Sequence, residues 1–254
     1  MRILIVNPNT TAAMTEKIGR AGRAAAASGT ELIVVNPADG PVSIEGYYDE
    51  AFSVPGLLAE IAKGDTLGVS AHIIACFDDT GLEAARSVAL APVIGIGEAA
   101  FHLASMLGHR FSVVTTLSRS IAAIENNLLK YGLAGRCGRV RASELPVLSL
   151  DDPSSDAAAQ IGAEIELAKQ EDRAEVIVLG CAGMADLAAR LSERHGLPVI
   201  DGIASAVKLG EALGALGLKT SKIGAYALPR PKAYVVNFCI LRTALENLSA
   251  SERS

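Results

Sequence analysis

Two cysteines stand in similar settings and could carry acid–base chemistry. Cys76 follows the short apolar run of residues 72–75, and Cys181 follows the run of residues 176–180. Except for Phe77, the residues that come directly after each cysteine are small or polar, and an alanine-rich amphipathic stretch then begins. This order predicts a buried strand, a tight turn and a helix at both places, with a thiol in each turn.

The surroundings of the two cysteines repeat along the chain at a spacing of about 105 residues. A Pro-Val-Ile segment follows each cysteine, at Pro92 and at Pro198, and each leads into a second helical run. The two halves also begin alike, with an apolar run that enters a polar loop, residues 7–10 and 115–118. This period is too long for a solenoid. It predicts two similar lobes that face each other, each with a thiol and a polar loop.

The composition narrows the classes of protein. Half of the 254 residues are hydrophobic but only 4% are aromatic, which is typical of buried parallel strands covered by helices. The net charge of −5 and the scattered basic residues indicate no nucleic-acid partner. The sequence has no apolar run of the roughly 18–20 residues needed to span a bilayer, so no membrane partner is expected. The first apolar run stops at Asn7, too early for a secretory signal.

The cysteines and histidines form no recognisable metal or disulfide pattern. Four cysteines in a chain of this length make neither a disulfide framework nor a spaced metal motif, and the four histidines lack metal-ligand spacing. We therefore expect a cytoplasmic protein with free thiols and no metal. Cys137 and Cys239 are interpreted as structural, and His72 as a core residue or a support for the site.

Predicted strands alternate with predicted helices along the whole chain, which favours parallel sheets. The expected strands are 2–6, 31–35, 72–76, 93–96, 111–114, a short one within 133–146, 175–179, and a possible returning strand at 223–226. The expected helices are 10–27, 58–62, 82–88, 98–107, 118–131 with Ser118 as N-cap, 154–169, 184–194, 204–213 and 233–248. Residues 40–50 lack a clear period and read as a loop, which either serves recognition or is simply packed on the surface.

The predicted fold class is α/β, with two pseudo-symmetric lobes. Each lobe is a parallel sheet flanked by helices, and the active site lies in the cleft between them. We expect the last helix to return to the first lobe, so that lobe one comprises 1–97 and 207–254 and lobe two comprises 98–206. Ligands bind outside the carboxyl ends of parallel strands, which is where both cysteine turns and both polar loops fall.

A small molecule held between the lobes would have one thiol on each side. This arrangement suits removal of a proton from one face of a carbon and return of a proton to the other, a two-base racemisation. A nearby helix N-terminus would favour the thiolate form of each cysteine. Asp78 and Asp79 oppose this at Cys76 unless they cap backbone N–H groups, and the sequence leaves both readings open. It shows no phosphate motif and no lysine-centred cofactor site, so no cofactor is expected, and backbone N–H groups would stabilise the charge on the substrate's own carbonyl.

Four motifs in order along the chain resemble the hydantoin racemases, which belong to the aspartate/glutamate racemase superfamily. The motifs are residues 7–10 (NPNT), 43–50 (SIEGYYDE), 75–81 (ACFDDTG) and 180–184 (GCAGM), and the resemblance covers nearly the whole chain. It implies that Cys76 and Cys181 are the catalytic acid/base residues of a cofactor-independent enzyme. It also implies 5-monosubstituted hydantoins as substrates, racemisation at C5, and, with the alanine-rich helices, a homo-oligomer.

Loop position and the resemblance also assign substrate contacts. The residues expected to touch the substrate are Asn9, Ile44, Tyr47, Phe77, Thr80, Thr116 and Gly183. The amino-acid racemases of the superfamily carry Cys-Asn-Thr and Cys-Thr-His at the two thiols, whereas this chain has Cys76-Phe77-Asp78 and Cys181-Ala182-Gly183. A less polar pocket fits a neutral ring better than a zwitterion, which counts against aspartate or glutamate as substrate.

Three other functions remain open. An allantoin racemase would perform the same chemistry on a hydantoin that bears a ureido group. A one-thiol decarboxylase of the same superfamily would tolerate the loss of one cysteine. In a non-catalytic small-molecule-binding protein, both cysteines would be small core residues, as cysteines after buried strands often are.

Overall fold

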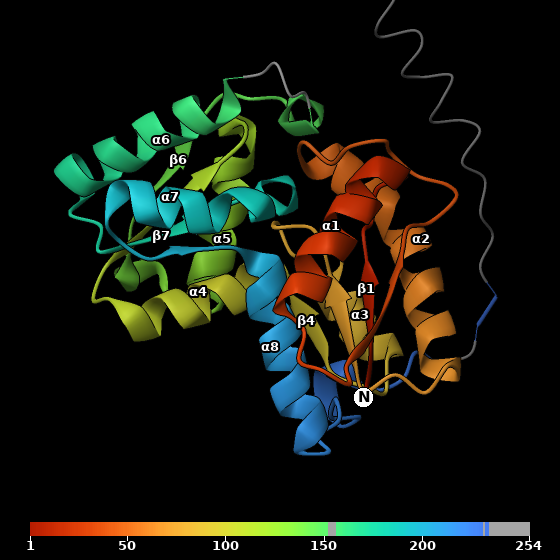
Figure 1. The fold of residues 1–254 in the computed structure, drawn as a ribbon. Coiled ribbons are helices and arrows are strands. Elements are labelled where there is room, and N and C mark those ends of the chain that lie inside the picture. The colour runs from red at the N-terminus through yellow and green to blue at the C-terminus, as the bar shows by residue number, and fades with distance from the viewer. Residues whose placement is uncertain (152–155, 231, 234–254) are drawn as a thin grey trace, which may run out of the picture.

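The structure is a computed structural model that describes residues 1–151, 156–230 and 232–233. It contains two four-stranded parallel sheets (Figure 1). The strands of the first sheet are β1 (Arg2–Val6), β2 (Glu31–Val35), β3 (Ala71–Ile74) and β4 (Val93–Gly95). Those of the second are β5 (Phe111–Thr115), β6 (Cys137–Ala142), β7 (Val176–Leu179) and β8 (Val199–Ile200). The orders are β2-β1-β3-β4 and β6-β5-β7-β8, so the second sheet repeats the first and the predicted two-lobed α/β fold is confirmed.

Helices flank both sheets. The α-helices are α1 (Ala12–Ala25), α2 (Tyr47–Thr66), α3 (Leu82–Val88), α4 (Ile96–Leu107), α5 (Ile121–Lys130), α6 (Ala157–Leu167), α7 (Ala188–His195) and α8 (Gly202–Ala215). In Figure 1, α1, α2 and α3 surround the first sheet, while α5, α6 and α7 surround the second. Helices α4 and α8 pack against each other, and α4 also contacts β7 of the second sheet while α8 contacts β1 and β3 of the first.

Successive side chains along a strand point to opposite faces of the sheet, so each strand contributes to two apolar cores. On β1, Leu4 and Val6 belong to an apolar cluster on the outer face of the first sheet, while Ile3 and Ile5 face the central cluster. The central cluster is continuous from the first sheet through α4 and α8 to the second sheet. Phe101 of α4 lies in this cluster, with its ring 5.3 Å from Phe77 and 6.0 Å from Phe111. One core therefore joins the two lobes and fixes how their strand ends face each other.

Helix α2 is the largest difference from the sequence-based elements. It begins at Tyr47 and includes Pro55, so it takes in the last four residues of the expected loop 40–50 and extends the expected helix 58–62 in both directions. Its buried stripe is Ser53, Leu57, Ile61 and Gly64, and two of these four residues are not apolar. The apolar periodicity that marks a helix is therefore weak in this sequence. Gly64 is required because a Cβ there would lie only 2.6 Å from Leu4.

Several smaller expectations also change. Residues 223–226 form no strand; Gly224–Tyr226 is a 3₁₀ turn, and Ile223 is exposed. Ser118 does not cap α5, because Ser118–Ser120 is a separate 3₁₀ turn and the helix begins at Ile121. The helix expected at 233–248 lies outside the described residues. The lobe boundaries, 1–97 with 207–254 and 98–206, therefore stay a prediction, although α8 does pack against β1 and β3 of the first sheet.

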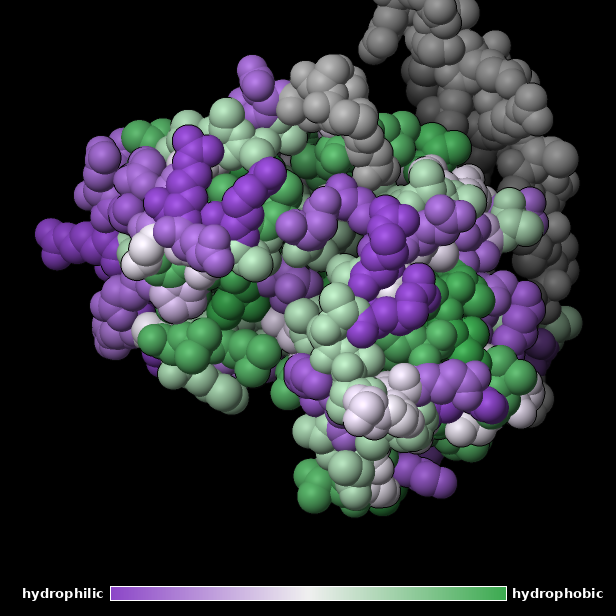
Figure 2. Space-filling view, in the orientation of Figure 1, coloured by the Kyte–Doolittle hydropathy of each residue, from purple (hydrophilic) through white to green (hydrophobic). Residues whose placement is uncertain are grey.

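The surface adds two observations. No helix in the described part of the chain has the length and apolar character needed to cross a membrane. Hydrophobic side chains nevertheless reach the surface at the ends of α4 and α8, where Met106, Leu107 and Leu216 are largely exposed. Figure 2 shows hydrophobic areas over these elements, at the lower left and at the bottom of the view.

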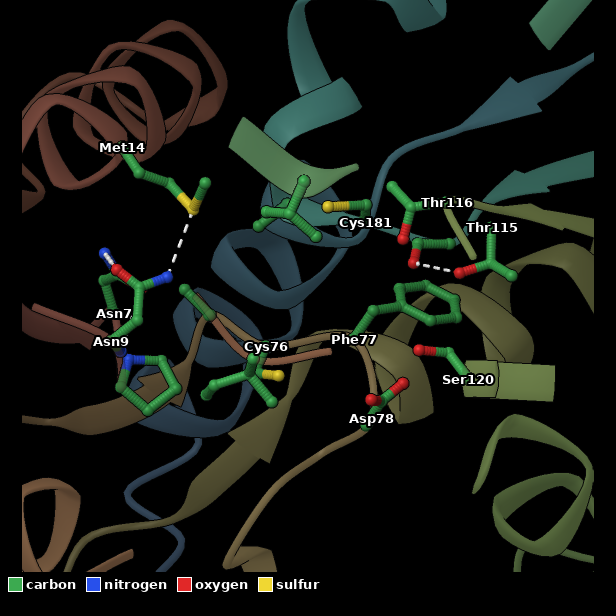
Figure 3. A pocket seen from close by; sticks show the side chains of 16 residues that line it. Asn7, Asn9, Met14, Cys76, Phe77, Asp78, Thr115, Thr116, Ser120 and Cys181 are labelled. Atoms are coloured by element: carbon green, nitrogen blue, oxygen red, sulfur yellow. Dashed lines mark hydrogen bonds between the residues drawn. The ribbon is translucent and has the colours of Figure 1, made fainter. Parts of the chain in front are cut away.

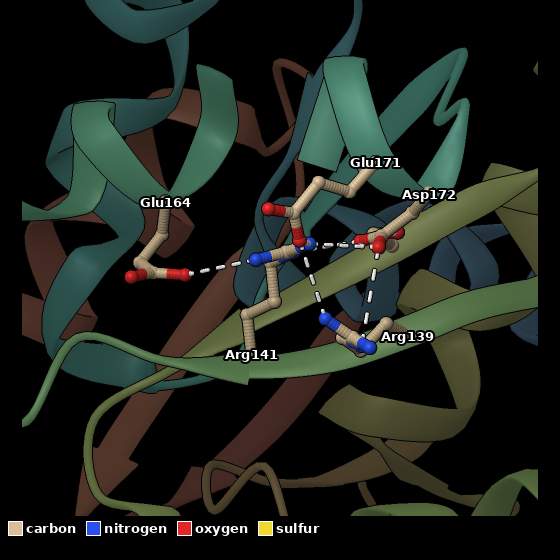
Figure 4. Close-up of polar contacts among 6 residues, drawn as sticks. Arg139, Arg141, Glu164, Glu171 and Asp172 are labelled. Atoms are coloured by element: carbon tan, nitrogen blue, oxygen red, sulfur yellow. Dashed lines mark hydrogen bonds and ion pairs between the residues drawn. The ribbon is translucent and has the colours of Figure 1, made fainter. Parts of the chain in front are cut away.

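A buried ion cluster stabilises the second lobe (Figure 4). Arg141 of β6 donates two hydrogen bonds to Asp172, at 2.7 and 2.8 Å, and one to Glu171 at 2.7 Å. Ser112 of β5 also donates to Asp172 at 3.0 Å. Asp172 ends the single π-helical turn Ala168–Asp172 that extends α6. The cluster therefore ties the end of α6 to β5 and β6.

Replacing Arg141 should destabilise the fold strongly, because Arg141→Met removes the buried counter-charge of Asp172 and leaves only the exposed Arg139, 4.0 Å away. Breaking a buried pair from one side typically costs about 3–5 kcal/mol. Arg139→Met is the matched control, since Arg139 contacts the same acids but its side chain is 58% exposed. We expect the control to cost less than about 1 kcal/mol. Urea unfolding measures both, and equal losses would contradict the assignment.

Candidate active site

The two cysteine turns open into one pocket at the carboxyl ends of the sheets. Cys76 follows β3 and Cys181 follows β7, and each is partly exposed in the pocket. The pocket has about 430 Å³ of empty space, including its open mouth. Its lining residues are Asn7, Pro8, Asn9, Met14, Ile44, Ala75, Cys76, Phe77, Asp78, Thr115, Thr116, Ser120, Val147, Gly180, Cys181 and Ala182. Figure 3 shows the two thiols entering it from separate loops.

Four of the seven expected substrate contacts line this pocket: Asn9, Ile44, Phe77 and Thr116. The other three do not. Thr80 lies behind Cys76 and donates a hydrogen bond to its sulfur at 3.4 Å. Tyr47 is largely exposed and accepts a hydrogen bond from Asn126 of the other lobe at 3.3 Å. Gly183 lies behind Cys181, where an added Cβ would be 3.7 Å from the sulfur.

Several lining residues were missed by the sequence-based reading. Met14 projects from α1, and Val147 begins the 3₁₀ turn Val147–Asp151 of the second lobe, whose sequence has no recognisable pattern. The backbone N–H of Val147 donates to Glu45 at 3.1 Å, so a loop from each lobe meets at this wall. Ser120 could have been found, because it follows the polar loop that repeats the Asn7 loop of the first half.

The surroundings of Cys76 favour the neutral thiol. Burial raises the pKa of Cys76 well above its usual range, and the adjacent Asp78 carboxylate raises it further. Hydrogen bonds from Thr80 and from the backbone N–H of Asp78 oppose this rise but are smaller effects. Helix α3 begins at Leu82, as expected, so its N-terminus lies six residues beyond Cys76 in the chain. Of the two readings that the sequence left open at Cys76, the neutral thiol is therefore the one that its surroundings favour.

Asp79 is a helix cap. Its carboxylate accepts hydrogen bonds from the backbone N–H groups of Gly97 and Glu98, at 2.9 and 2.8 Å, at the start of α4. Tyr131, at the end of α5, donates to the same carboxylate at 2.8 Å. Gly95 permits this approach, because a Cβ there would lie 2.1 Å from the carboxylate. The sequence left open whether the adjacent acids Asp78 and Asp79 cap backbone N–H groups, and Asp79 does so.

Asp78 differs from its neighbour, because its carboxylate lines the pocket and caps no helix. Burial raises the pKa of Asp78 to about 7, and the negative charges of Glu50 and Asp79 add to the effect. Its backbone carbonyl accepts a hydrogen bond from Asn127 of α5 at 2.7 Å. The loop is thus fixed to the second lobe while the side chain points to the pocket (Figure 3).

Cys181 is held by a different set of contacts. It precedes the 3₁₀ turn Ala182–Leu187, and its carbonyl accepts from Met184 N–H at 3.1 Å. Thr115 Oγ1 donates to the carbonyl of Gly180 at 3.0 Å, which joins the loop to β5. A Cβ at Gly180 would lie 2.8 Å from Thr115, so this close approach requires glycine.

The remaining polar groups of the pocket are neutral. Asn9 donates to the sulfur of Met14 at 3.3 Å, a weak acceptor that a ligand could replace. The hydroxyls of Thr116 and Ser120 also line the pocket. Among the described lining residues there is no lysine, arginine or histidine. The described part of the chain also holds no group of three or more potential metal ligands.

Comparison with known proteins identifies the family. Residues 3–210 match the family model described as Asp/Glu/Hydantoin racemase. The chain belongs to this family. It is 51% identical over 233 residues to the hydantoin racemase of Rhizobium meliloti, which covers 92% of this chain and 97% of that one. It is 44% identical over 252 residues to the hydantoin racemase of a Pseudomonas species, covering 99% and 98% of the two chains.

A solved structure agrees with these relatives. The allantoin racemase of Klebsiella pneumoniae superposes with a TM-score of 0.91 at 49% sequence identity. The match covers 95% of this chain and 98% of that one. This member of the Asp/Glu/Hydantoin racemase family is therefore an isomerase that acts as a racemase.

Asp78→Asn should make Cys76 more reactive at mildly alkaline pH. The substitution removes a negative charge beside the thiol, which lowers the pKa of Cys76 and raises the thiolate fraction. Iodoacetamide labelling at pH 8.5, quantified for each cysteine by mass spectrometry, measures the change. Labelling of Cys137 in the same sample and of Cys76 in the exposed-site variant Asp39→Asn are the controls. Slower or unchanged labelling of Cys76 would contradict the charge effect.

The adjacent acids should also differ in their effect on stability. Asp79→Ala removes the cap of α4 and places alanine at a positive φ of 51°, so we expect a loss of about 2 kcal/mol or more. Asp78→Ala removes no capping hydrogen bond and should cost less than about 1 kcal/mol. Thermal and urea unfolding of the two variants test this, and the reverse order would refute the assignment of the cap.

Proposed function

We propose that the protein racemises 5-monosubstituted hydantoins at C5 by proton transfer between two cysteines. The observation that carries this proposal is that Cys76 and Cys181 line one pocket that has neutral hydrogen-bonding groups and no cationic side chain among its described residues. The hydantoin racemase names of the relatives support the substrate class.

The proton steps follow from the two thiols. For the enantiomer whose C5–H faces Cys181, the Cys181 thiolate takes this proton, and the Cys76 thiol delivers its own proton to the opposite face. Cys181 then carries the thiol and Cys76 the thiolate. For the other enantiomer the roles are reversed. The raised pKa of Cys76 supports its role as the acid in the first case.

The intermediate carries a negative charge that C5 shares with the adjacent C4 carbonyl. The hydroxyls of Thr116 and Ser120 and the amide of Asn9 line the pocket and can donate hydrogen bonds to this oxygen. Neutral donors suffice because the C5 anion of a hydantoin is conjugated with an adjacent carbonyl. An amino acid would in addition require a partner for its carboxylate, and the described lining residues include no cation.

The apolar side chains of the pocket favour some C5 substituents over others. Met14, Ile44 and Val147 line the pocket together. An alkyl or aryl substituent would bury apolar surface against these side chains, whereas a ureido group would leave its hydrogen-bonding groups unpaired there. We therefore favour alkyl or aryl hydantoins. Allantoin is the second candidate, because of the 49% identity to an allantoin racemase.

A cytoplasmic location, the lack of a cofactor and a homo-oligomeric state stay part of this proposal. The exposed hydrophobic residues at the ends of α4 and α8 are consistent with self-association. The activity of single-cysteine variants separates the proposal from the one-thiol decarboxylase alternative, because a one-thiol enzyme would tolerate the loss of one cysteine.

Incubation of one enantiomer of 5-benzylhydantoin in D₂O tests the function. We expect loss of optical rotation together with deuterium at C5, in excess of the spontaneous exchange in buffer. A parallel reaction with one enantiomer of allantoin gives the ratio of kcat/KM for the two substrates. If benzylhydantoin neither racemises nor exchanges, the proposal fails. A higher kcat/KM for allantoin would transfer the assignment to the second candidate.

Cys76→Ala and Cys181→Ala should each lose racemisation by about 100-fold or more, because each enantiomer requires both an acid and a base. Cys137→Ala is the matched control; this cysteine lies on β6 and does not line the pocket, so the rate should change little. Polarimetry measures the rates, and circular dichroism checks that the variants are folded. Full activity in either active-site variant would exclude the two-thiol mechanism.

A further inference from the structure

The charge of the pocket is carried by one side chain. Of the residues that line it in the described structure, Asp78 is the only one with an ionisable acidic or basic group other than the two thiols. The other polar members are asparagines, threonines and a serine. A carboxylate with no counter-charge in a small, partly dehydrated pocket repels anions, because the local dielectric screens the charge less than water does.

The Asp78 carboxylate points into the part of the pocket where a ligand would bind (Figure 3). Its neighbour Asp79 faces away, bonded to the start of α4 and to Tyr131. Glu50 of α2 is close enough to raise the pKa of Asp78, so it adds negative charge on the same side. The groups that face Asp78 are thus acids, thiols and hydroxyls, with no cation among the described lining residues.

We propose that Asp78 is a specificity-determining residue that admits neutral cyclic imides and excludes their ring-opened carboxylates. This inference rests on the proposed function, since it concerns the same pocket. Hydrolysis of a hydantoin adds water across the C4–N3 bond: C4 becomes a carboxylate, N3 becomes the terminal amide of a ureido group, and one proton is released. The product has the same stereocentre and a similar size. It differs chiefly in its carboxylate, whose negative charge would lie close to that of Asp78.

The exclusion should depend on pH in a defined direction. Burial and the charges of Glu50 and Asp79 raise the pKa of Asp78 to about 7. A ureido carboxylate remains ionised well below this pH. Above pH 7 both groups are negative and repel each other. Below pH 7 Asp78 takes up a proton, so the affinity for the carboxylate should increase as the pH falls.

A matched pair of probes isolates the charge. N-carbamoylphenylalanine carries the carboxylate, and N-carbamoylphenylalanine amide has the same shape without it. Calorimetry at pH 8 gives the affinity of each for the wild-type protein, for Asp78→Asn and for the control Asp39→Asn. Asp39 is exposed and does not line the pocket, so its substitution makes the same change in net charge elsewhere.

We expect the amide to bind all three proteins with similar affinity. The acid should bind Asp78→Asn about tenfold or more tightly than it binds the wild type or Asp39→Asn, because like charges in a binding site are strongly unfavourable. Between pH 8 and pH 6, binding of the acid to the wild type should tighten, and binding to Asp78→Asn should stay constant.

Equal affinity of the acid for the wild type and Asp78→Asn would overturn the inference and leave the racemase proposal unaffected. A gain in Asp39→Asn as large as in Asp78→Asn would also overturn it, since it would assign the effect to net charge. If the wild type binds neither the amide nor 5-benzylhydantoin, the proposed substrate class fails, and the inference fails with it.

Discussion

The close packing of the Cys76 loop on the start of α4 is the constraint on which the rest of the site depends. Gly95 and Gly97 leave the backbone of this helix start bare, and a Cβ at Gly97 would lie 2.4 Å from the carbonyl of Phe77. The start of α8 meets the same place, where a Cβ at Gly202 would lie 2.6 Å from the carbonyl of Ile96. Glycine at these three positions therefore allows α4, α8 and the Cys76 loop to pack closely together.

This packing couples the chemistry of the site to the architecture of the whole chain. Asp79 binds α4 and Tyr131, so the segment that follows Cys76 is attached to both lobes. The ring of Phe77 contacts Phe101 in the apolar core that runs between the sheets. Because these anchors hold the residues on either side of it, Asp78 can project into the pocket without a structural role of its own.

The sequence was sufficient to predict the fold and to point to Cys76 and Cys181, which share one pocket. It was less informative about the rest of the pocket, since only four of the seven expected substrate contacts line it. Residues 2–6 and 31–35 form strands as expected, and the repeat around Cys76 and Cys181 correctly indicated two similar sheets. Helix α2 was partly missed because serine and glycine occupy half of its buried stripe. The different roles of Asp78 and Asp79 could not be predicted. Asp79 caps the start of α4 at Gly97, which lies 18 residues further along the chain.

The two halves cap their central helices in different ways. In the second half, Asp201 caps α8 with its own carboxylate, at 2.8 Å from Ala204 N–H. The corresponding position in the first half is Gly95, and Asp79 supplies the missing carboxylate from the thiol loop. Under the proposed two-thiol mechanism, the thiols act in unequal surroundings on two enantiomers that have the same free energy in solution. The equilibrium constant between the enantiomers is therefore 1, which requires the same kcat/KM for both. The difference between the two halves can then appear only in the separate values of kcat and KM for each enantiomer.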